Sequence, residues 1–216
     1  MKNIYLNIFR FNGNTLNKTI KCLKKNDIAA LPTETVYGLA GNAYSKIASE
    51  KIYKIKNRPK INPLIVHYFD LESAKKDIIL NESFLKLYKK FCPGPLTFIL
   101  KKKKNSKISS EITAKLDTLA IRFPRHNIIR SVLKKIDFPL AMPSANISSG
   151  ISPVTAKDVS EEFNEKIKII IDGGKAKIGI ESTVVDLSKK FKILRPGAIT
   201  PKEISLTLKK KVSIIK

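Results

Sequence analysis

The sequence predicts an α/β protein with a twisted, mixed and open sheet that is flanked by helices. Two observations support this fold class. Short apolar runs bounded by turn residues alternate with longer segments whose apolar residues recur at helical spacing. The chain has 216 residues, of which 43% are hydrophobic. This length suits one large domain or two small ones and allows a substantial core.

The strands are predicted from short apolar runs that end at turn residues or at proline. Pro32 stops the second run, for example, and Pro63 precedes the third. The runs cover residues 4–9, 28–31, 64–67, 97–100, 119–123, 140–142, 167–172, 183–187 and 191–194, and a last short strand is expected at 212–215.

The helices are predicted from apolar spacing between capping residues and helix breakers. In the first helix, Leu16, Ile20 and Leu23 fall on one face. Ser45 can cap the second helix, and Pro59 prevents it from continuing. The helices are expected at 15–25, 45–56, 81–91, 127–135 and 155–163, with a further one capped by Asp70 and a last one capped by Thr200.

Charge is the unusual property of the composition. Lys and Arg number 42 against 18 Asp and Glu, which gives a formal net charge of +24. Such an excess favours acidic partners such as nucleic acid or nucleotides. The lysines are nevertheless spread over the whole chain, with runs only at 101–104 and 209–211. A solvated surface is the simpler explanation of those runs.

Arginine is informative because it is scarce in a chain that otherwise fills its basic positions with lysine. The planar guanidinium makes paired hydrogen bonds that an ammonium group cannot make. Arg58, Arg122 and Arg195 each lie in a segment with other polar residues. We therefore interpret these three arginines as binding residues.

Several functional classes are disfavoured by the sequence. Cys22 and Cys92 are far apart and form no CxxC pair, and no metal-ligand cluster is visible. No phosphate loop or GxGxxG turn occurs. Because there is also no nucleophile elbow with a Ser/His/Asp arrangement, and no His/Cys cluster, we expect no covalent catalysis and no protein-held transition metal. The N-terminus has no apolar leader and no run could span a membrane, so we expect a cytoplasmic protein without membrane contact.

Two polar segments nearly ninety positions apart have the groups that a polyanion needs. Lys56 and Arg58 supply an ammonium and a guanidinium at a helix end, and Asn62 follows on a loop fixed by prolines. Ser144 and Asn146 supply a hydroxyl and an amide in the turn after a strand. We expect the cations to attract a phosphate chain, and the hydroxyl and amide to orient it as neutral donors. A basic helix end that interacts with the helix dipole is the alternative for the first segment.

Further polar side chains lie where strands end, as ligand-binding groups often do in α/β proteins. Thr35 lies in the segment PTETVYGL, Arg122 lies in an otherwise apolar strand, and Ser182 precedes another strand. His67 ends the strand at 64–67. Structural roles are open for them as well. A capped turn with Glu34 as an ordinary first-turn acid would explain the first segment, and a place at the rim of the core would explain the histidine.

Taken in order, these segments resemble those of the threonylcarbamoyl-AMP synthase family, whose members have a YrdC-like catalytic domain. The resemblance covers most of the chain, from residue 28 to residue 200. The resemblance rests on the segments PTETVYGL, KNRPKINPLIVH, PGPLTFIL, LAIRFPRH, PSANISSG, IESTVVDL and LRPGAIT. It implies a YrdC-like fold with a basic concave cleft, in a single catalytic domain over residues 1–216. The second C-terminal domain that some members carry is not expected.

The resemblance also implies an activity. Members of the family are nucleotidyltransferases that condense L-threonine, bicarbonate and ATP, with Mg²⁺, to threonylcarbamoyl-AMP and pyrophosphate. The product serves the threonylcarbamoyl modification of the tRNA adenosine next to the anticodon. The implied partners are a downstream tRNA threonylcarbamoyltransferase complex and, through weak binding, tRNA itself.

The family's site residues transfer to the matching positions of this sequence. The catalytic part of the nucleotide site would consist of Lys56, Arg58, Ser144 and Asn146. Further ATP contacts would come from Asn62, Thr118, Ser152 and Arg195. Threonine would be held by Thr35, His67, Arg122, Met142 and Ser182. We expect Arg122 to pair with the carboxylate of threonine.

Two other functions fit parts of the sequence. Related enzymes with the same domain, among them hydrogenase-maturation carbamoyltransferases, would carry out a different carbamoyl or adenylate transfer. A tRNA or double-stranded RNA binding module would account for the net charge. Against the RNA-binding module, no aromatic stacking platform is visible and Trp is absent.

Overall fold

The computed structural model confirms the α/β fold class. It describes residues 6–163, 166–189 and 191–214. Within them the strands are β1 (Ile8–Arg10), β2 (Ala29–Leu31), β3 (Gly38–Asn42), β4 (Val66–His67), β5 (Leu96–Lys101), β6 (Thr118–Arg122), β7 (Leu140–Ala141), β8 (Ile170–Asp172), β9 (Thr183–Asp186), β10 (Lys192–Arg195) and β11 (Ser213–Ile214). These strands join in one sheet, in the order β1-β8-β2-β3-β7-β4-β6-β5-β9-β10-β11.

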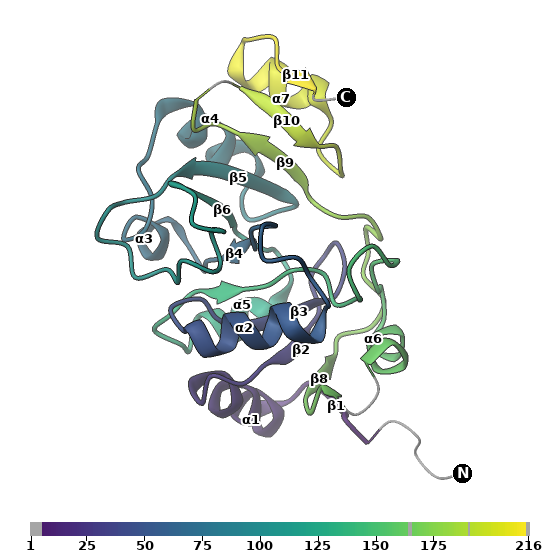
Figure 1. Cartoon of the computed structure of the whole chain (residues 1–216). Coiled ribbons are helices and arrows are strands. Elements are labelled where there is room, and N and C mark those ends of the chain that lie inside the picture. The colour runs from purple at the N-terminus through teal and green to yellow at the C-terminus, as the bar shows by residue number, and fades with distance from the viewer. Residues whose placement is uncertain (1–5, 164–165, 190, 215–216) are drawn as a thin grey trace.

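Helices pack against both halves of this sheet (Figure 1). They are α1 (Gly13–Lys24), α2 (Lys46–Ile55), α3 (Leu71–Ala74), α4 (Glu82–Phe91), α5 (Asn127–Leu133), α6 (Ala156–Phe163) and α7 (Pro201–Leu208). Helices α1, α2 and α6 lie by the half that holds β1, β2, β3 and β8, and α4 and α7 pack on each other by the other half. None of the helices in the described parts of the chain is long and apolar enough to cross a membrane.

The sheet is mixed, as predicted. β4 pairs in parallel with β6, and β5 pairs in parallel with β9. β3 pairs antiparallel with β2 and with β7, and β7 pairs antiparallel with β4. The parallel register of β4 and β6 places His67 opposite Arg122. Two predicted site residues therefore lie side by side at the ends of neighbouring strands.

One strand, β3, lies where the sequence favours a loop. Glycine weakens a strand, and β3 contains Gly38 and Gly41. Both glycines lie at close contacts, and the contact is tighter at Gly38. A Cβ on Gly38 would lie 2.7 Å from Cγ of Met142, and a Cβ on Gly41 would lie 3.1 Å from Cδ1 of Ile52 in α2. The absence of these side chains lets the chain after β7 and helix α2 approach β3.

The predicted helix caps are confirmed. Ser45, Asp70, Asn81 and Thr200 each accept a hydrogen bond from a backbone N–H in the first turn of a helix. The helix that Asp70 caps is a single turn, because the chain beyond it turns into the core, where the buried Asp77 is held by Tyr68 and Ser106.

Within the described residues, the terminal strands cover only part of the predicted ranges. The first, expected at 4–9, is found at Ile8–Arg10, and the part of the prediction at residues 4 and 5 lies outside the described residues. The last, expected at 212–215, is found at Ser213–Ile214, and residue 215 also lies outside the described residues.

The main hydrophobic core lies between the sheet and helices α2, α4, α6 and α7. At its centre the Phe84 ring meets the Phe98 ring edge to face, with 5.0 Å between the ring centroids. Ile204 and Leu208 of α7 are buried in the same core. The C-terminal helix is therefore part of the packed domain.

Replacing Phe84 by Ala should lower the free energy of unfolding by about 3–5 kcal/mol, because it would leave a cavity where a fully buried ring packs. Urea unfolding followed by circular dichroism measures the change. The matched control is the next residue of α4, Leu85, which is 42% exposed. Leu85→Ala should cost less than about 0.5 kcal/mol. Equal losses in the two variants would contradict this core.

Candidate functional site

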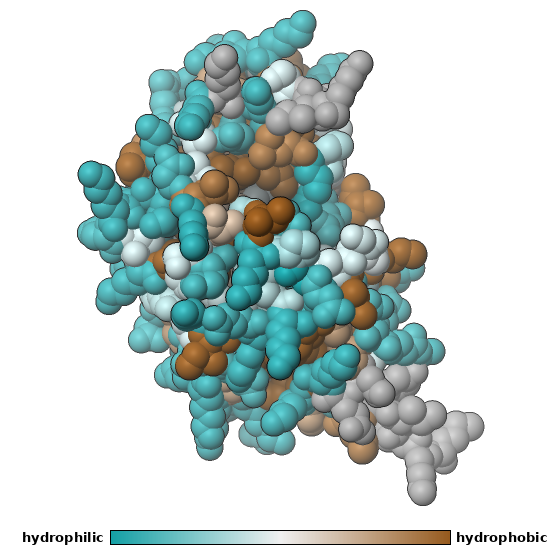
Figure 2. Space-filling view, in the orientation of Figure 1, coloured by the Kyte–Doolittle hydropathy of each residue, from teal (hydrophilic) through white to brown (hydrophobic). Residues whose placement is uncertain are grey.

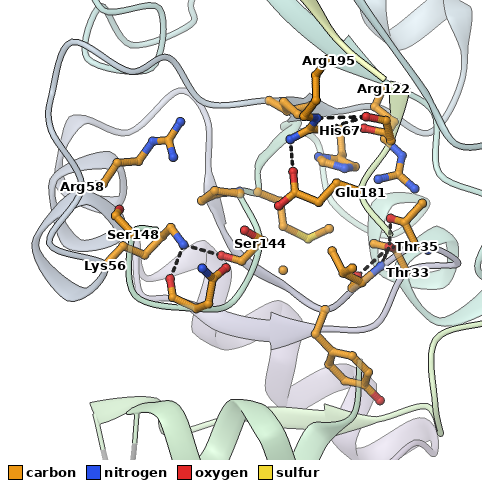
Figure 3. Close-up of a pocket in the computed structure, with 18 of the residues that line it drawn as sticks. Thr33, Thr35, Lys56, Arg58, His67, Arg122, Ser144, Ser148, Glu181 and Arg195 are labelled. Atoms are coloured by element: carbon orange, nitrogen blue, oxygen red, sulfur yellow. Dashed lines mark hydrogen bonds and ion pairs between the residues drawn. The ribbon is translucent and has the colours of Figure 1, made fainter. Parts of the chain in front are cut away.

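The polar segments predicted to bind ligands meet at one cavity of about 280 Å³. It lies where β4, β6 and β10 end, between the chain before β3, the turn after β7 and the chain before β9 (Figure 3). Most of the residues predicted for the two substrates line it, namely Thr35, Lys56, Arg58, His67, Arg122, Met142, Ser144, Asn146, Ser182 and Arg195. The face of the molecule that Figure 2 shows is mainly hydrophilic, with scattered apolar side chains.

The end of α2 directs two cations towards the cavity. Asn57 has a φ of 49°, a left-handed conformation that Asn tolerates better than most residues. Its N–H bonds the carbonyl of Lys54 at 3.2 Å. The N–H of Arg58 bonds the carbonyl of Tyr53 at 3.0 Å, which completes the Schellman arrangement of a helix end. The chain reversal at Asn57 leaves Lys56 and Arg58 on either side, and both line the cavity.

Lys56 joins the two segments that were predicted to hold one polyanion. Its side chain is buried, and its ammonium donates to the backbone carbonyl of Ser144 at 2.6 Å and to that of Asn146. The carbonyl of Lys56 accepts from the N–H of Ser148 at 2.9 Å. Two of the three ammonium donors are used, which leaves one for a ligand. Burial, with a smaller effect of Arg58, lowers the pKa of Lys56 to about 8.

The side chain of Asn146 has an acceptor and no donor left for a ligand, which corrects its predicted part as a donor. Its Nδ2 donates to the carbonyl of Ile147 at 2.7 Å and to that of Gly150 at 2.9 Å. Both amide donors are therefore used within the turn, and Oδ1 is buried without a partner among the described residues. Because ionised phosphate offers only acceptors, this oxygen suits a hydroxyl or amino group of a ligand.

Buried polar atoms without partners gather at this cavity. Among the described residues they are both ring nitrogens of His67, Oδ1 of Asn146 and Oγ of Ser148, and all three residues line the cavity. Buried polar groups in folded proteins nearly always have a hydrogen-bond partner. Their concentration here indicates a site that a polar ligand completes.

Arg122 is fixed by a buried ion pair. Its Nη2 donates to Oε1 of Glu34 at 2.7 Å, and the two side chains are 5% and 9% exposed. The other carboxylate oxygen accepts from the backbone N–H of Arg125 at 3.0 Å. Burial alone would raise the pKa of Glu34, but Arg122 and these hydrogen bonds hold it below its usual value. Since no helix begins at Glu34, it is a counter-ion and not a first-turn acid.

Two hydroxyl pairs flank this ion pair. The Thr33 and Thr35 hydroxyls lie 2.8 Å apart, and Thr33 also donates to the carbonyl of Val36. The Ser182 hydroxyl lies 2.8 Å from that of Thr97. These contacts fix the hydroxyls of Thr35 and Ser182, which were predicted to bind threonine.

Four cations line the cavity. They are Lys56, Arg58, Arg122 and Arg195, and among the described residues the one carboxylate in the lining belongs to Glu181. Burial, and then repulsion by the other two arginines, lowers the pKa of Arg195 to about 10. The group nevertheless stays charged at neutral pH, so the cavity has an excess of positive charge.

Three predicted ATP contacts are not in the lining. Asn62 lies beside it, because its carbonyl accepts from Nε of Arg58 at 3.2 Å. Ser152 also lies beside it, because its hydroxyl donates to Glu181 at 2.7 Å. Thr118 begins β6, four residues before the end of the strand that meets the cavity, or about 13 Å away at roughly 3.3 Å per residue. The structure does not bring Thr118 to the cavity.

Ser148 and Glu181 are among the lining residues that were not predicted as site residues. Ser148 belongs to the hydroxyl-rich turn PSANISSG, so its neighbours gave a usable signal. Glu181 stands directly before Ser182, in a chain with few acids. Its contacts come from residues 14 and 29 positions away, which the sequence does not reveal.

Comparison with known proteins finds close relatives. Residues 21–197 match the model of the Sua5, YciO and YrdC family, which is described as Telomere recombination. The chain is 44% identical over 186 residues to a threonylcarbamoyl-AMP synthase of Pyrococcus abyssi, a match that covers 84% of this chain and 54% of that protein. A relative in Methanocaldococcus jannaschii is 35% identical over 92% of this chain and 95% of its own length.

The fold is also similar to that of solved structures. The Pyrococcus abyssi Sua5 protein, crystallised with L-threonine, has a TM-score of 0.90 and 38% sequence identity to this chain. The match covers 96% of this chain and 62% of that one. The chain thus spans little more than half the length of the Pyrococcus protein.

Replacing Asn57 by Val should lower the free energy of unfolding by about 1–2 kcal/mol, because a β-branched side chain is strained in the left-handed conformation. Asn57→Gly is the matched control, since glycine adopts this conformation without strain and should leave stability nearly unchanged. Thermal and urea unfolding measure both variants. If Val were tolerated as well as Gly, the helix end described for α2 would be wrong.

Proposed function

Because the chain belongs to the Sua5, YciO and YrdC family, we propose that it condenses L-threonine, bicarbonate and ATP to threonylcarbamoyl-AMP and pyrophosphate. One observation carries the proposal: residues predicted for the two substrates line one cavity, together with buried polar atoms that lack partners. The name of the Pyrococcus relative supports the activity, and the L-threonine complex of Sua5 supports the amino acid substrate.

The triphosphate is proposed to bind at the end of α2. Lys56, Arg58 and Arg195 supply positive charge, and a guanidinium group can bond two phosphate oxygens at once. The unpartnered Oδ1 of Asn146 would accept a hydrogen bond from a hydroxyl of the sugar or from the amino group of the base. Because the helix end and the turn after β7 are already bonded to each other, these groups lose little freedom on binding.

Threonine is proposed to bind beside Arg122. Glu34 and the carbonyl of Gly94 occupy Nη2 and Nε of its guanidinium, which leaves Nη1 for the carboxylate of the substrate. Burial and the neighbouring Arg122 lower the pKa of His67 well below its usual value, so its ring is neutral at pH 7. A neutral ring has one donor and one acceptor, which suits the hydroxyl or amino group of threonine.

The proposed chemistry needs no bond to the protein. The amino group of threonine forms a bond to the carbon of bicarbonate, and the C–O bond that breaks releases one water molecule, with a proton from the nitrogen, to give threonine carbamate. An oxygen of the carbamate group then attacks the α-phosphorus of ATP, and the bond from that phosphorus to the bridging oxygen breaks, with its electron pair leaving on pyrophosphate. Lys56, Arg58 and Arg195 would neutralise the charge that shifts onto pyrophosphate. Holding both substrates in one cavity supplies the rest of the rate acceleration, because the reacting atoms no longer have to meet by diffusion.

Magnesium is proposed to arrive with ATP as part of the substrate. In the part of the chain that the structure describes, no group of three or more His, Cys, Asp or Glu side chains is arranged to hold a metal ion. The carboxylate in the lining, that of Glu181, is already bonded to Arg195. Phosphate oxygens and water would therefore supply most of the ligands of the ion.

The product would pass to an enzyme that transfers its threonylcarbamoyl group to tRNA, in the cytoplasm. The formal net charge of +24 would favour weak, salt-sensitive contact with tRNA during this step.

The proposed activity predicts that the purified protein releases pyrophosphate from ATP only when both L-threonine and bicarbonate are present. A coupled pyrophosphate assay measures this, with each substrate omitted in turn. Release without threonine would indicate a different adenylate transfer. Tight RNA binding without any release would favour an RNA-binding module instead.

In the same assay Arg58→Ala should abolish turnover while the circular dichroism spectrum stays unchanged. Lys60→Ala is the matched control, because Lys60 is an exposed cation two residues away that does not line the cavity. Near-normal activity of Arg58→Ala would refute the assignment of the triphosphate to this end of α2.

The affinity for ATP should fall as the pH rises, because a deprotonated Lys56 no longer attracts phosphate. With a pKa of about 8, the Kd should rise about tenfold between about pH 7.5 and about pH 9, as measured by calorimetry. Unfolding of the protein would not explain a weaker affinity for ATP at high pH. The unfolded chain keeps the lysine protonated up to its ordinary pKa of 10.5, so this group makes folding more favourable as the pH rises through 8.

Lys56→Met controls for other titrating groups. It should bind ATP weakly at every pH and lack the tenfold change. A variant with the same pH dependence as the wild type would show that another group is responsible.

A further inference from the structure

Two of the predicted ATP contacts are bonded to the same carboxylate. The Ser152 hydroxyl donates to Oε1 of Glu181 at 2.7 Å, and Nη1 of Arg195 donates to Oε2 (Figure 3 shows the Arg195 contact). Ser152 precedes α6 and Arg195 ends β10, so Glu181 bridges two parts of the fold. A carboxylate thus occupies donors that the sequence assigns to the nucleotide.

The remaining donors of Arg195 point elsewhere. Its Nε and Nη2 donate to the carbonyl of Ser182 at 3.1 and 2.8 Å, so the guanidinium is anchored along one edge. The Nη1 side is the one that pairs with Glu181. Glu181 holds one of the two Nη1 N–H groups, so a triphosphate that binds both of them without breaking the anchor must displace the carboxylate.

The backbone of Glu181 is held in place by close packing against Gly197. A Cβ added to Gly197 would lie 2.4 Å from the carbonyl oxygen of Glu181, so the two segments touch. The carboxylate itself is less constrained, since the side chain is 31% exposed. It can swing towards solvent without moving the backbone, whereas the buried Glu34 cannot.

We propose that Glu181 is an internal counter-ion that holds Arg195 and Ser152 in the ligand-free protein and that the triphosphate of ATP displaces. The inference rests on the proposed function for the identity of the ligand. A triphosphate offers both residues the anionic oxygens that Glu181 offers now, but it also meets Lys56 and Arg58. After the reaction the carboxylate returns to Arg195 and so favours the departure of pyrophosphate.

The proposal predicts that Glu181→Gln binds polyanions more tightly. The change keeps the side-chain volume and removes one negative charge from a cavity that the triphosphate enters, so the Kd for ATP and for inorganic triphosphate should each fall about tenfold. Calorimetry with these two probes measures the Kd, and circular dichroism checks the fold. Turnover should not rise with affinity, because pyrophosphate is also held more tightly.

Glu50→Gln is the matched control. It removes the same charge from an exposed position of α2 outside the cavity lining, and its Kd values should equal those of the wild type. Glu181→Asp keeps the charge and should stay within about twofold of the wild type, so it tests the proposal even if the Gln variant does not fold.

An unchanged or weaker affinity of Glu181→Gln for inorganic triphosphate would overturn the proposal, since Glu181 would then be a ligand-binding residue or a structural one. The two proposals fail separately. Tighter triphosphate binding without threonine-dependent pyrophosphate release would refute only the proposed function, and normal release without tighter binding would refute only the role of Glu181.

Discussion

The buried ammonium group of Lys56 holds the end of α2 against the turn after β7. It donates to the carbonyls of Ser144 and Asn146, and the carbonyl of the same lysine accepts from Ser148. A buried cation without such partners would be strongly destabilising, so the lysine and the turn fix each other. Both segments line the cavity, and the same lysine lies where the proposed phosphate chain would enter. One residue therefore serves both architecture and recognition.

Two carboxylates balance the arginines of the cavity, and they do so in different ways. Glu34 is buried, and its second oxygen is held by backbone N–H groups, so its pair with Arg122 is permanent. Glu181 is partly exposed and is bonded through side chains to Arg195 and Ser152. The permanent pair lies beside the proposed amino acid site, and the exchangeable pair lies beside the proposed triphosphate site. A fixed guanidinium suits a small carboxylate, whereas an exchangeable one suits a polyanion that must enter and leave.

Local signals predicted most of the fold. Capping residues such as Ser45 and Asn81 act within one turn of their helices, and their hydrogen bonds are present in the structure. Strand β3 was not predicted, because Gly38 and Gly41 resemble turn residues when they are viewed alone. Tertiary packing explains these two glycines, because the missing side chains leave room for Met142 and Ile52. The site segments were found from their residue types and from family resemblance, and ten of their predicted members line the cavity.

By itself the sequence determined which groups the protein offers to a ligand, because residue types and local spacing depend on the chain alone. Only the tertiary structure decided what those groups already contact. Arg122 and Glu34 are 88 positions apart, and Lys56 and Asn146 are 90 apart, so folding alone makes them partners. Contacts in the folded chain use the amide donors of Asn146, two nitrogens of Arg122 and one edge of Arg195. What remains free, and therefore what a ligand can bind, follows from the folded network of hydrogen bonds.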